Sequence, residues 1–281
     1  MSKTITQKNY TTKYITLTYI AFWLGVLIIG GLFLLTNASW LTDFATIPLS
    51  WIPTIVLLVM FNKLIPNSTR KQWVKKSFSA KVNIRIVLFS ALAFILSIVL
   101  TYLIMLCYNS DVTKITFNSS TIITILSAFV MSAITGATGE ELGWRGYLQN
   151  YYETQYGGNV IKASLKVGLV WTLWHIPLWL TSTADQSVWF MLNHIITFSI
   201  QCMSLAIIIA ICYKHCRNIF IPMWIHFLSN FTMAIVSPYF TTSTAIMNGK
   251  CWLALFYSII AFMCILWHRK QLIQNKQNTQ A

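Results

Sequence analysis

Two adjacent carboxylates are the first residues of this sequence that could do chemistry. Glu140 and Glu141 stand at the end of an apolar run, in the segment 138–147 (TGEELGWRGY). Arg145 follows Glu141 by four residues, so these two side chains share a helical face and can form a charge-assisted pair. Glu140 is then rotated by about 100° and can act elsewhere as an acid or base. The alternative, in which Glu141 and Arg145 only hold helices together, leaves Glu140 without a partner.

Two histidines lie inside other apolar runs. His175 follows Trp171 by one helical turn, and Asn230 follows His226 by one turn, so each pair can address the same cavity. A single histidine in a helical bundle is more often a helix-to-helix hydrogen bonder than a catalyst. Glu140, His175 and His226, however, each lie nine or ten residues from a polar residue at the expected cytoplasmic edge. At 1.5 Å per residue this places all three at one depth, roughly 13–15 Å from that edge.

The composition predicts the elements that must position these residues. Of 281 residues, 56% are apolar and only 9% are charged, and the mean hydropathy is +0.63. A soluble globular protein carries roughly 25% charged residues, so this chain could not cover its surface in water. Disorder, a collagen-like fibre and a disulfide-stapled secreted domain are excluded on the same grounds. We expect a multi-pass protein of the cell membrane.

Eight apolar runs are each near the ~20 residues that a membrane-spanning helix needs. Pro48 and Pro53 in the second run and Pro177 in the fifth predict that those helices are kinked or start late. We therefore expect an all-α bundle of about eight transmembrane helices over 14–268, with its functional core at about 120–236 and tails at 1–13 and 269–281. The runs are 15–35, 41–61, 84–106, 121–139, 164–181, 188–212, 219–236 and 252–267.

The basic residues predict the orientation. With the N-terminus in the cytoplasm, eighteen of the twenty Lys and Arg residues fall on the cytoplasmic side, and only Lys114 and Lys250 fall in outer loops. This partition needs an even number of spans and puts both termini in the cytoplasm. The net charge of +14 then reflects topology and contact with anionic lipids rather than a nucleic-acid partner.

The three polar motifs together resemble the CPBP family of intramembrane proteases, also called the Abi family, which includes type II CAAX prenyl proteases and bacteriocin-processing or immunity proteins. The family pattern is Glu-Glu-x-x-x-Arg, then Phe-x-x-x-His, then His-x-x-x-Asn or Asp, each on its own helix. Here the motifs appear in order over about 90 residues, as Glu140-Glu141 with Arg145, Trp171 with His175, and His226 with Asn230. The one departure is Trp171, where the family prefers Phe; it keeps an aromatic wall and bears on substrate fit.

The resemblance implies a role for each residue. Glu140 would act as general base on a water that His175 also holds. His226 and Asn230 would donate hydrogen bonds to the tetrahedral oxyanion. Glu141 and Arg145 would support this arrangement.

A zinc site is the alternative mechanism, because Glu140, His175 and His226 form a ligand set that zinc accepts. The sequence lacks His-Glu-x-x-His, and Glu140 used as a ligand leaves the general base unassigned. We therefore favour a metal-independent mechanism without a cofactor.

The expected activity is endopeptidase cleavage of a membrane-associated peptide or protein, in bacteriocin maturation or self-immunity. Two other classes stay open. A non-catalytic membrane scaffold or immunity protein could keep the same motifs, and a proton-coupled transporter could use intramembrane Glu, His and Arg as a relay. The transporter predicts polar residues across the whole membrane and internal repeats, which the sequence does not display.

Overall fold

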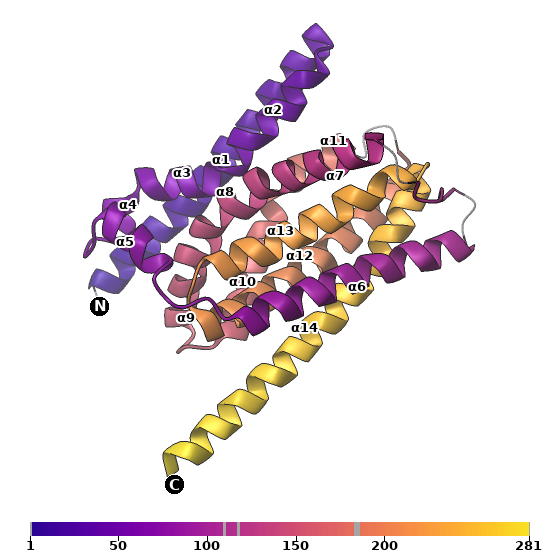
Figure 1. Cartoon of the computed structure of the whole chain (residues 1–281). Coiled ribbons are helices and arrows are strands. Elements are labelled where there is room, and N and C mark those ends of the chain that lie inside the picture. Colours follow the sequence, from indigo (N-terminus) through magenta and orange to yellow (C-terminus); the bar gives the residue numbers. More distant parts are fainter. Residues whose placement is uncertain (1, 109–110, 117–118, 183–185, 281) are drawn as a thin grey trace.

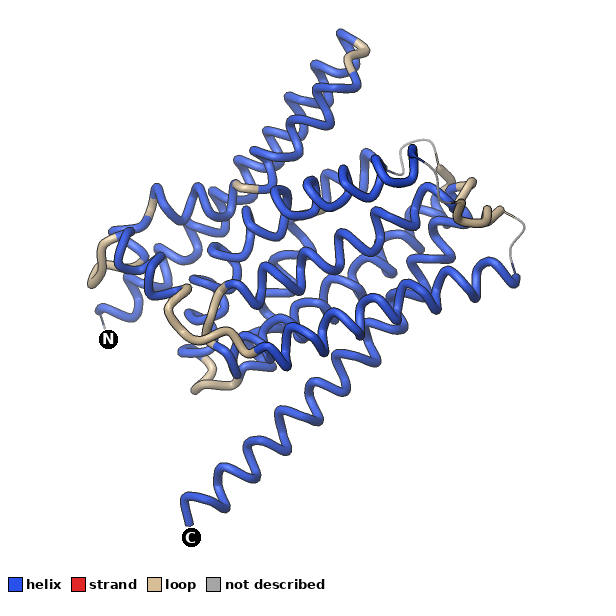
Figure 2. The backbone as a smooth tube through the Cα atoms, viewed as in Figure 1, coloured by secondary structure: helices blue, strands red, loops and turns tan. Residues whose placement is uncertain are grey.

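The fold is all-helical, as the sequence predicts. The computed structural model describes residues 2–108, 111–116, 119–182 and 186–280, and within these ranges the secondary structure is helical apart from one β-bridge between Val112 and Phe240. Figure 2 shows the helices joined by short loops. In chain order the helices are α1 (Ser2–Thr36), α2 (Ser39–Ser50), α3 (Ile52–Val59), α4 (Phe61–Leu64), α5 (Arg70–Ser77), α6 (Ile84–Tyr108), α7 (Ser119–Ser132), η1 (Ala133–Ala137), α8 (Thr138–Glu141), η2 (Leu142–Gln149), α9 (Asn150–Gln155), α10 (Val160–Trp174), α11 (Ile176–Ser182), α12 (Val188–Cys216), α13 (Phe220–Val236), η3 (Ser237–Tyr239) and α14 (Ser243–Gln280).

Six helical stretches of the described chain are long and apolar enough to cross a membrane. Each contains or overlaps one of the predicted apolar runs, so the polytopic all-α class is confirmed. The eight-span count and the cytoplasmic termini stay predictions. The six stretches are Thr6–Thr36, Ile84–Tyr108, Ser119–Gln155, Val188–Cys216, Phe220–Tyr239 and Ser243–Asn275.

The other two predicted runs are each divided into two short helices. Run 41–61 breaks at Trp51 between α2 and α3, and Pro53 occupies the first turn of α3. Run 164–181 breaks at His175 between α10 and α11, two residues before Pro177. Proline lacks the N–H that would continue the preceding helix and its ring clashes with the previous turn, so each run is interrupted at a single residue near Pro53 or Pro177, whereas Pro48 lies within α2.

α12 forms the centre of the bundle, with α10 and α14 packed along it (Figure 1). The segment of α12 from Leu205 to Cys212 is buried almost continuously. A helix that is apolar and buried on all sides belongs to a core rather than to a surface. In contrast, α1 and α6 expose leucines such as Leu35 and Leu88 on their outer faces, as expected for helices in contact with hydrocarbon.

Both ends of the chain are more helical than the apolar runs indicate. α1 begins at Ser2 and α14 continues to Gln280, so helix extends through most of the segments expected as tails at 1–13 and 269–281. The early part of α1 also packs, because the Thr11 hydroxyl lies 2.7 Å from the hydroxyl of Tyr147. The C-terminal part of α14 leaves the bundle (Figure 1).

Candidate active site

A break in the helical path after α7 creates the site. Within η1, Thr135 is extended (φ −99°, ψ 151°), and Gly136 has φ +58° and ψ −74°. Glycine adopts a positive φ without the steric penalty that a Cβ brings. A Cβ at Gly136 would also lie 3.0 Å from His226 Nε2 and 3.0 Å from Asn230 Nδ2. The break therefore brings this backbone directly against the two polar side chains of α13.

Two further glycines seat the short helix α8, which carries both carboxylates. A Cβ at Gly139 would lie 2.8 Å from the Ser50 carbonyl oxygen, and one at Gly143 would lie 2.8 Å from the Pro53 carbonyl oxygen. Small residues four apart let two helical backbones approach this closely. The chain segment 138–143 is thereby held against α2 and α3.

Glu141 is the centre of a buried polar network. Its Oε1 accepts a hydrogen bond from Arg145 Nη1 at 2.9 Å and another from His226 Nδ1 at 2.8 Å. Glu141 and Arg145 are fully buried. The pairing of Glu141 with Arg145 follows the predicted spacing, whereas the bond to His226 was not predicted. It ties the first motif to the third.

Glu140 is held by two tryptophans. Its Oε2 accepts from the indole N–H of Trp171 at 2.6 Å and from that of Trp144 at 3.1 Å. Sequence reasoning missed Trp144, although a signal was present: Trp144 follows Glu140 by four residues, just as Arg145 follows Glu141. Both indoles bond the same oxygen, and Oε1 carries neither of these bonds.

Trp171 joins all three motifs. Besides its bond to Glu140, its ring centre lies 5.1 Å from that of His226 and 6.0 Å from that of His175. The guanidinium of Arg145 lies 4.4 Å from its ring centre. Arg145 Nε and Nη2 have no hydrogen-bond partner in the described part of the chain, and the cation instead faces the indole.

His175 caps the end of α10. Its Nδ1 lies 2.8 Å from the Trp171 carbonyl oxygen, one turn earlier. A carbonyl only accepts, so this Nδ1 carries the proton and Nε2 carries a lone pair. The tautomer is thus assigned from the network, and it leaves Nε2 able to accept a hydrogen bond from water.

α1 holds the same end of α10 from the other side. The Tyr19 hydroxyl donates to the Val170 carbonyl at 2.5 Å, and the Trp23 indole donates to the Trp174 carbonyl at 3.1 Å. The last four carbonyls of a helix have no partner within it, so a side chain of a neighbouring helix satisfies that of Trp174 here. The position of His175 therefore depends on α1 as well as on α10.

A cavity of about 480 Å³ opens in front of these side chains. Trp171, His175, His226 and Asn230 line it, together with residues of η1, α12 and α14. Glu140 and Glu141 are not among the lining residues, but they bond Trp171 and His226, respectively, which are. The structure thus brings all seven predicted residues into one contiguous cluster, with four of them at the cavity.

Lys250 is a second residue that sequence reasoning missed. The basic-residue pattern put it in an outer loop, but it lies within α14 and lines the cavity. The Gln201 amide donates to the Lys250 carbonyl at 2.7 Å, which joins α12 to α14 at this level. The prediction failed because the apolar run begins at residue 252, whereas the helix starts nine residues earlier, at Ser243.

The described residues contain no group of three His, Cys, Asp or Glu side chains placed to hold a metal ion. Glu140, His175 and His226 are therefore not grouped as a zinc ligand set in the described structure.

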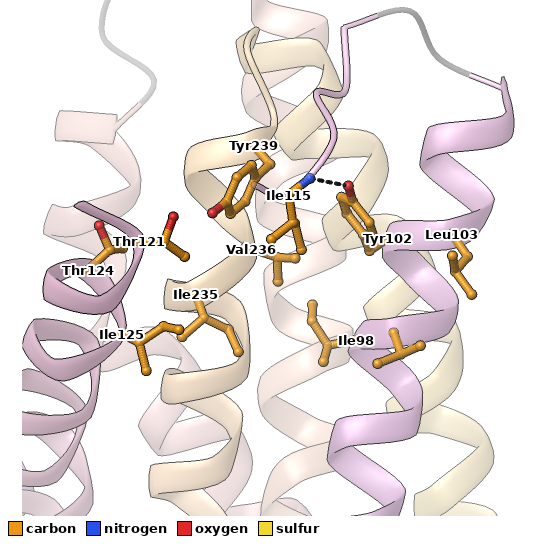
Figure 3. A pocket seen from close by; sticks show the side chains of 11 residues that line it. Ile98, Tyr102, Leu103, Ile115, Thr121, Thr124, Ile125, Ile235, Val236 and Tyr239 are labelled. Carbon is orange, nitrogen blue, oxygen red and sulfur yellow. Dashed lines mark hydrogen bonds between the residues drawn. The ribbon is translucent and has the colours of Figure 1, made fainter. Parts of the chain in front are cut away.

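A separate apolar groove of about 220 Å³ lies between α6, α7 and α13. Figure 3 shows its lining, in which Tyr102 accepts a hydrogen bond from the Ile115 backbone amide at 3.0 Å. Its lining has no charged side chain.

Comparison with known proteins supports the family to which the motifs point. Residues 118–232 match the family model described as "Type II CAAX prenyl endopeptidase Rce1-like". CAAX prenyl protease 2 of Methanococcus maripaludis is 26% identical over 194 residues, which cover 66% of this chain and 69% of that protein. The predicted resemblance is confirmed, and the matches support a multi-pass membrane protein with intramembrane endopeptidase activity.

Proposed function

We propose that this member of the CPBP family of type II CAAX proteases hydrolyses a peptide bond with a water molecule activated by Glu140. The observation that carries the proposal is the bridge formed by Trp171, whose indole bonds Glu140 while its ring lies against both histidines. General-base catalysis needs such a fixed carboxylate near the reacting atoms. Glu140 takes a proton from the water, whose oxygen attacks the carbonyl carbon. The same proton then passes to the leaving amine nitrogen as the C–N bond breaks.

His226 is the proposed oxyanion donor, and its protonation state decides whether it can act. Its Nδ1–H is engaged by Glu141, so only the doubly protonated ring presents an Nε2–H to the substrate. Glu140, Glu141 and Arg145 together carry one net negative charge, which a proton on His226 balances. Asn230 Nδ2 is the second proposed donor. It and His226 Nε2 both lie 3.0 Å from the position that a Cβ would take on Gly136.

His175 is proposed to hold the water. Its Nδ1 is engaged by the Trp171 carbonyl, so its Nε2 lone pair can accept from a water molecule in the cavity. It carries no carboxylate partner among the described residues, in contrast to His226. The two histidines therefore act in different protonation states, one as an acceptor and one as a donor.

We propose that the mechanism needs no metal ion. Glu140 used as a zinc ligand would leave the general base unassigned, and Glu140, His175 and His226 are not grouped as a ligand set in the described structure. The proposal assigns the proton transfers to residues of this chain alone.

The proposed substrate is a membrane-associated peptide or protein. The named relative is a CAAX prenyl protease, which makes a peptide bearing a prenylated cysteine the first substrate to test. A role in bacteriocin maturation or self-immunity is the proposed biology. Lys71, Lys75 and Lys76 on the exposed helix α5 are the proposed contacts with anionic lipid headgroups.

The proposal is tested by peptidomics of membranes that contain the wild-type chain, Glu140→Gln or Glu153→Gln. Glu153 is a matched control, because it is also buried but pairs with Lys214 and Arg217 away from the cavity. We expect new peptide fragments with the wild type and Glu153→Gln and none with Glu140→Gln. Identical peptides in all three membranes would refute the protease function.

A further inference from the structure

We propose that Lys250 binds the C-terminal carboxylate of the substrate, so that the cavity selects peptides with a free C-terminus. This inference rests on the proposed protease function and names the group that recognises the substrate end. It starts from the placement of Lys250 in the same cavity as His175 and His226.

Lys250 lies in a stretch of α14 that is apolar enough to span a membrane. Ionisable side chains at membrane depth are costly and usually face a cavity or a partner, where they serve a function. Lys250 is among the residues that line the cavity and is partly buried. Its position is fixed from behind by the bond from Gln201 to its carbonyl.

The charge of Lys250 is not balanced within the described part of the chain. No ion pair there includes Lys250. The four carboxylates whose side chains the structure describes are engaged elsewhere: Glu140 by two indoles, Glu141 by Arg145 and His226, Glu153 by Lys214 and Arg217, and Asp111 by Thr242. His194 is close enough to interact with the Lys250 charge, but a histidine does not neutralise a cation. A cation facing a largely apolar cavity favours an anionic ligand.

The spacing along α14 fits a peptide stretched between the two ends of the cavity. Lys250, Leu253 and Tyr257 line one face of α14, and the Tyr257 hydroxyl donates to Ser229 Oγ at 3.2 Å, next to Asn230. Seven residues of helix separate Lys250 from Tyr257, which is about 10 Å. An extended chain covers that distance in about three residues. A carboxylate at Lys250 would thus leave a peptide bond a few residues upstream at the level of Asn230.

The test uses one farnesylated peptide in three forms, with a fluorophore and quencher on either side of the bond after the prenylated cysteine. The first form ends in a free carboxylate, the second in an amide, and the third in an amide with glutamate as its last residue. The third form tests whether a side-chain carboxylate can replace the C-terminal carboxylate.

The proteins are the full chain in lipid nanodiscs as wild type, Lys250→Met, Lys250→Arg and Lys114→Met. Lys114 is a matched control, because it is an exposed outer lysine that does not line the cavity.

Cleavage and binding are measured separately, so that the two proposals fail in different ways. For the wild type and Lys114→Met we expect KM for the free-acid peptide to be about 10- to 100-fold below that for both amides, as expected for a charge-assisted hydrogen bond. Lys250→Met should lose this preference, so that its KM values for the three forms become equal, and Lys250→Arg should retain most of it. Dissociation constants in the Glu140→Gln background should follow the same pattern.

Equal affinity of the wild type for the acid and the plain amide, or an acid preference that survives Lys250→Met, would overturn the role of Lys250. A preference for the amidated glutamate peptide equal to that for the acid would also overturn it, because the site would then read any carboxylate. Absence of cleavage with the binding preference intact would refute the protease function and leave the carboxylate site standing.

Discussion

The indole N–H of Trp171 donates a 2.6 Å hydrogen bond to Glu140 Oε2, across 31 positions of the chain. The family pattern has phenylalanine at this position, and a phenyl ring has no such donor. Trp171 is therefore more than an aromatic wall, because it positions the carboxylate proposed as the general base. The second indole bond, from Trp144, comes from the same helical segment as Glu140.

Trp171→Phe tests this positioning role. The substitution keeps the ring beside Arg145 and the histidines but removes the bond to Glu140. A hydrogen bond to a charged group contributes about 1.5–3 kcal/mol. We expect kcat on the farnesylated peptide to fall about 10-fold or more with KM little changed, measured in nanodiscs.

Trp144→Phe is the comparison, because Trp144 donates the longer bond to the same oxygen, at 3.1 Å. We expect a smaller loss of kcat in that variant. Unchanged kcat in Trp171→Phe would show that the bond does not matter for the reaction.

Gly136→Ala tests the helix break. Alanine at φ +58° and ψ −74° is strained by about 1–3 kcal/mol. Its Cβ would also push against His226 Nε2 and Asn230 Nδ2. Misplacing reacting groups by about 1 Å can reduce the rate about 100-fold, so we expect a loss of kcat of that order.

Gly31→Ala is the control for this substitution, because a Cβ there meets no atom within 4 Å. It should leave both the rate and the thermal unfolding midpoint close to those of the wild type. A fully active Gly136→Ala protein would show that the oxyanion donors tolerate displacement and would count against their proposed role.

Arg145→Met and Glu141→Gln separate stability from catalysis. Removing one member of a buried ion pair costs about 3–5 kcal/mol of unfolding free energy. Replacing both members should restore most of that stability, because neither charge is then left unpaired. We expect the double variant to fold but to have low activity, since His226 loses the carboxylate that supports its protonated form.

Thermal unfolding and kcat measured on the two single variants and the double variant check this prediction. High activity in the stable double variant would mean that Glu141 serves the fold alone.

Chelation tests the metal-independent mechanism. We expect kcat to be unchanged after incubation with 1,10-phenanthroline followed by buffer exchange, because each proposed proton transfer uses a residue of this chain. The measurement is the cleavage rate before and after treatment, with and without added zinc. Activity that disappears on chelation and returns with zinc would replace the proposed mechanism by the zinc alternative.

The helical class, the positions of the apolar segments and three polar motifs could be predicted from the sequence. Hydrocarbon thickness sets the length of a spanning segment, and the helical repeat sets which residues share a face, so both are local properties. The spacing of Glu141 and Arg145 is of this kind, and their bond is found at 2.9 Å. The breaks beside Pro53 and Pro177 are local as well.

The partners that join different helices depended on the tertiary structure. Neither the bond from His226 to Glu141 nor that from Trp171 to Glu140 follows from any spacing, because the packing of α8, α10 and α13 sets them. The same is true of Lys250, whose place at the cavity depends on where α14 begins and how it lies on α12. A one-dimensional pattern gives the depth and face of a residue on its own helix, whereas the rotation and approach of neighbouring helices decide which side chains meet.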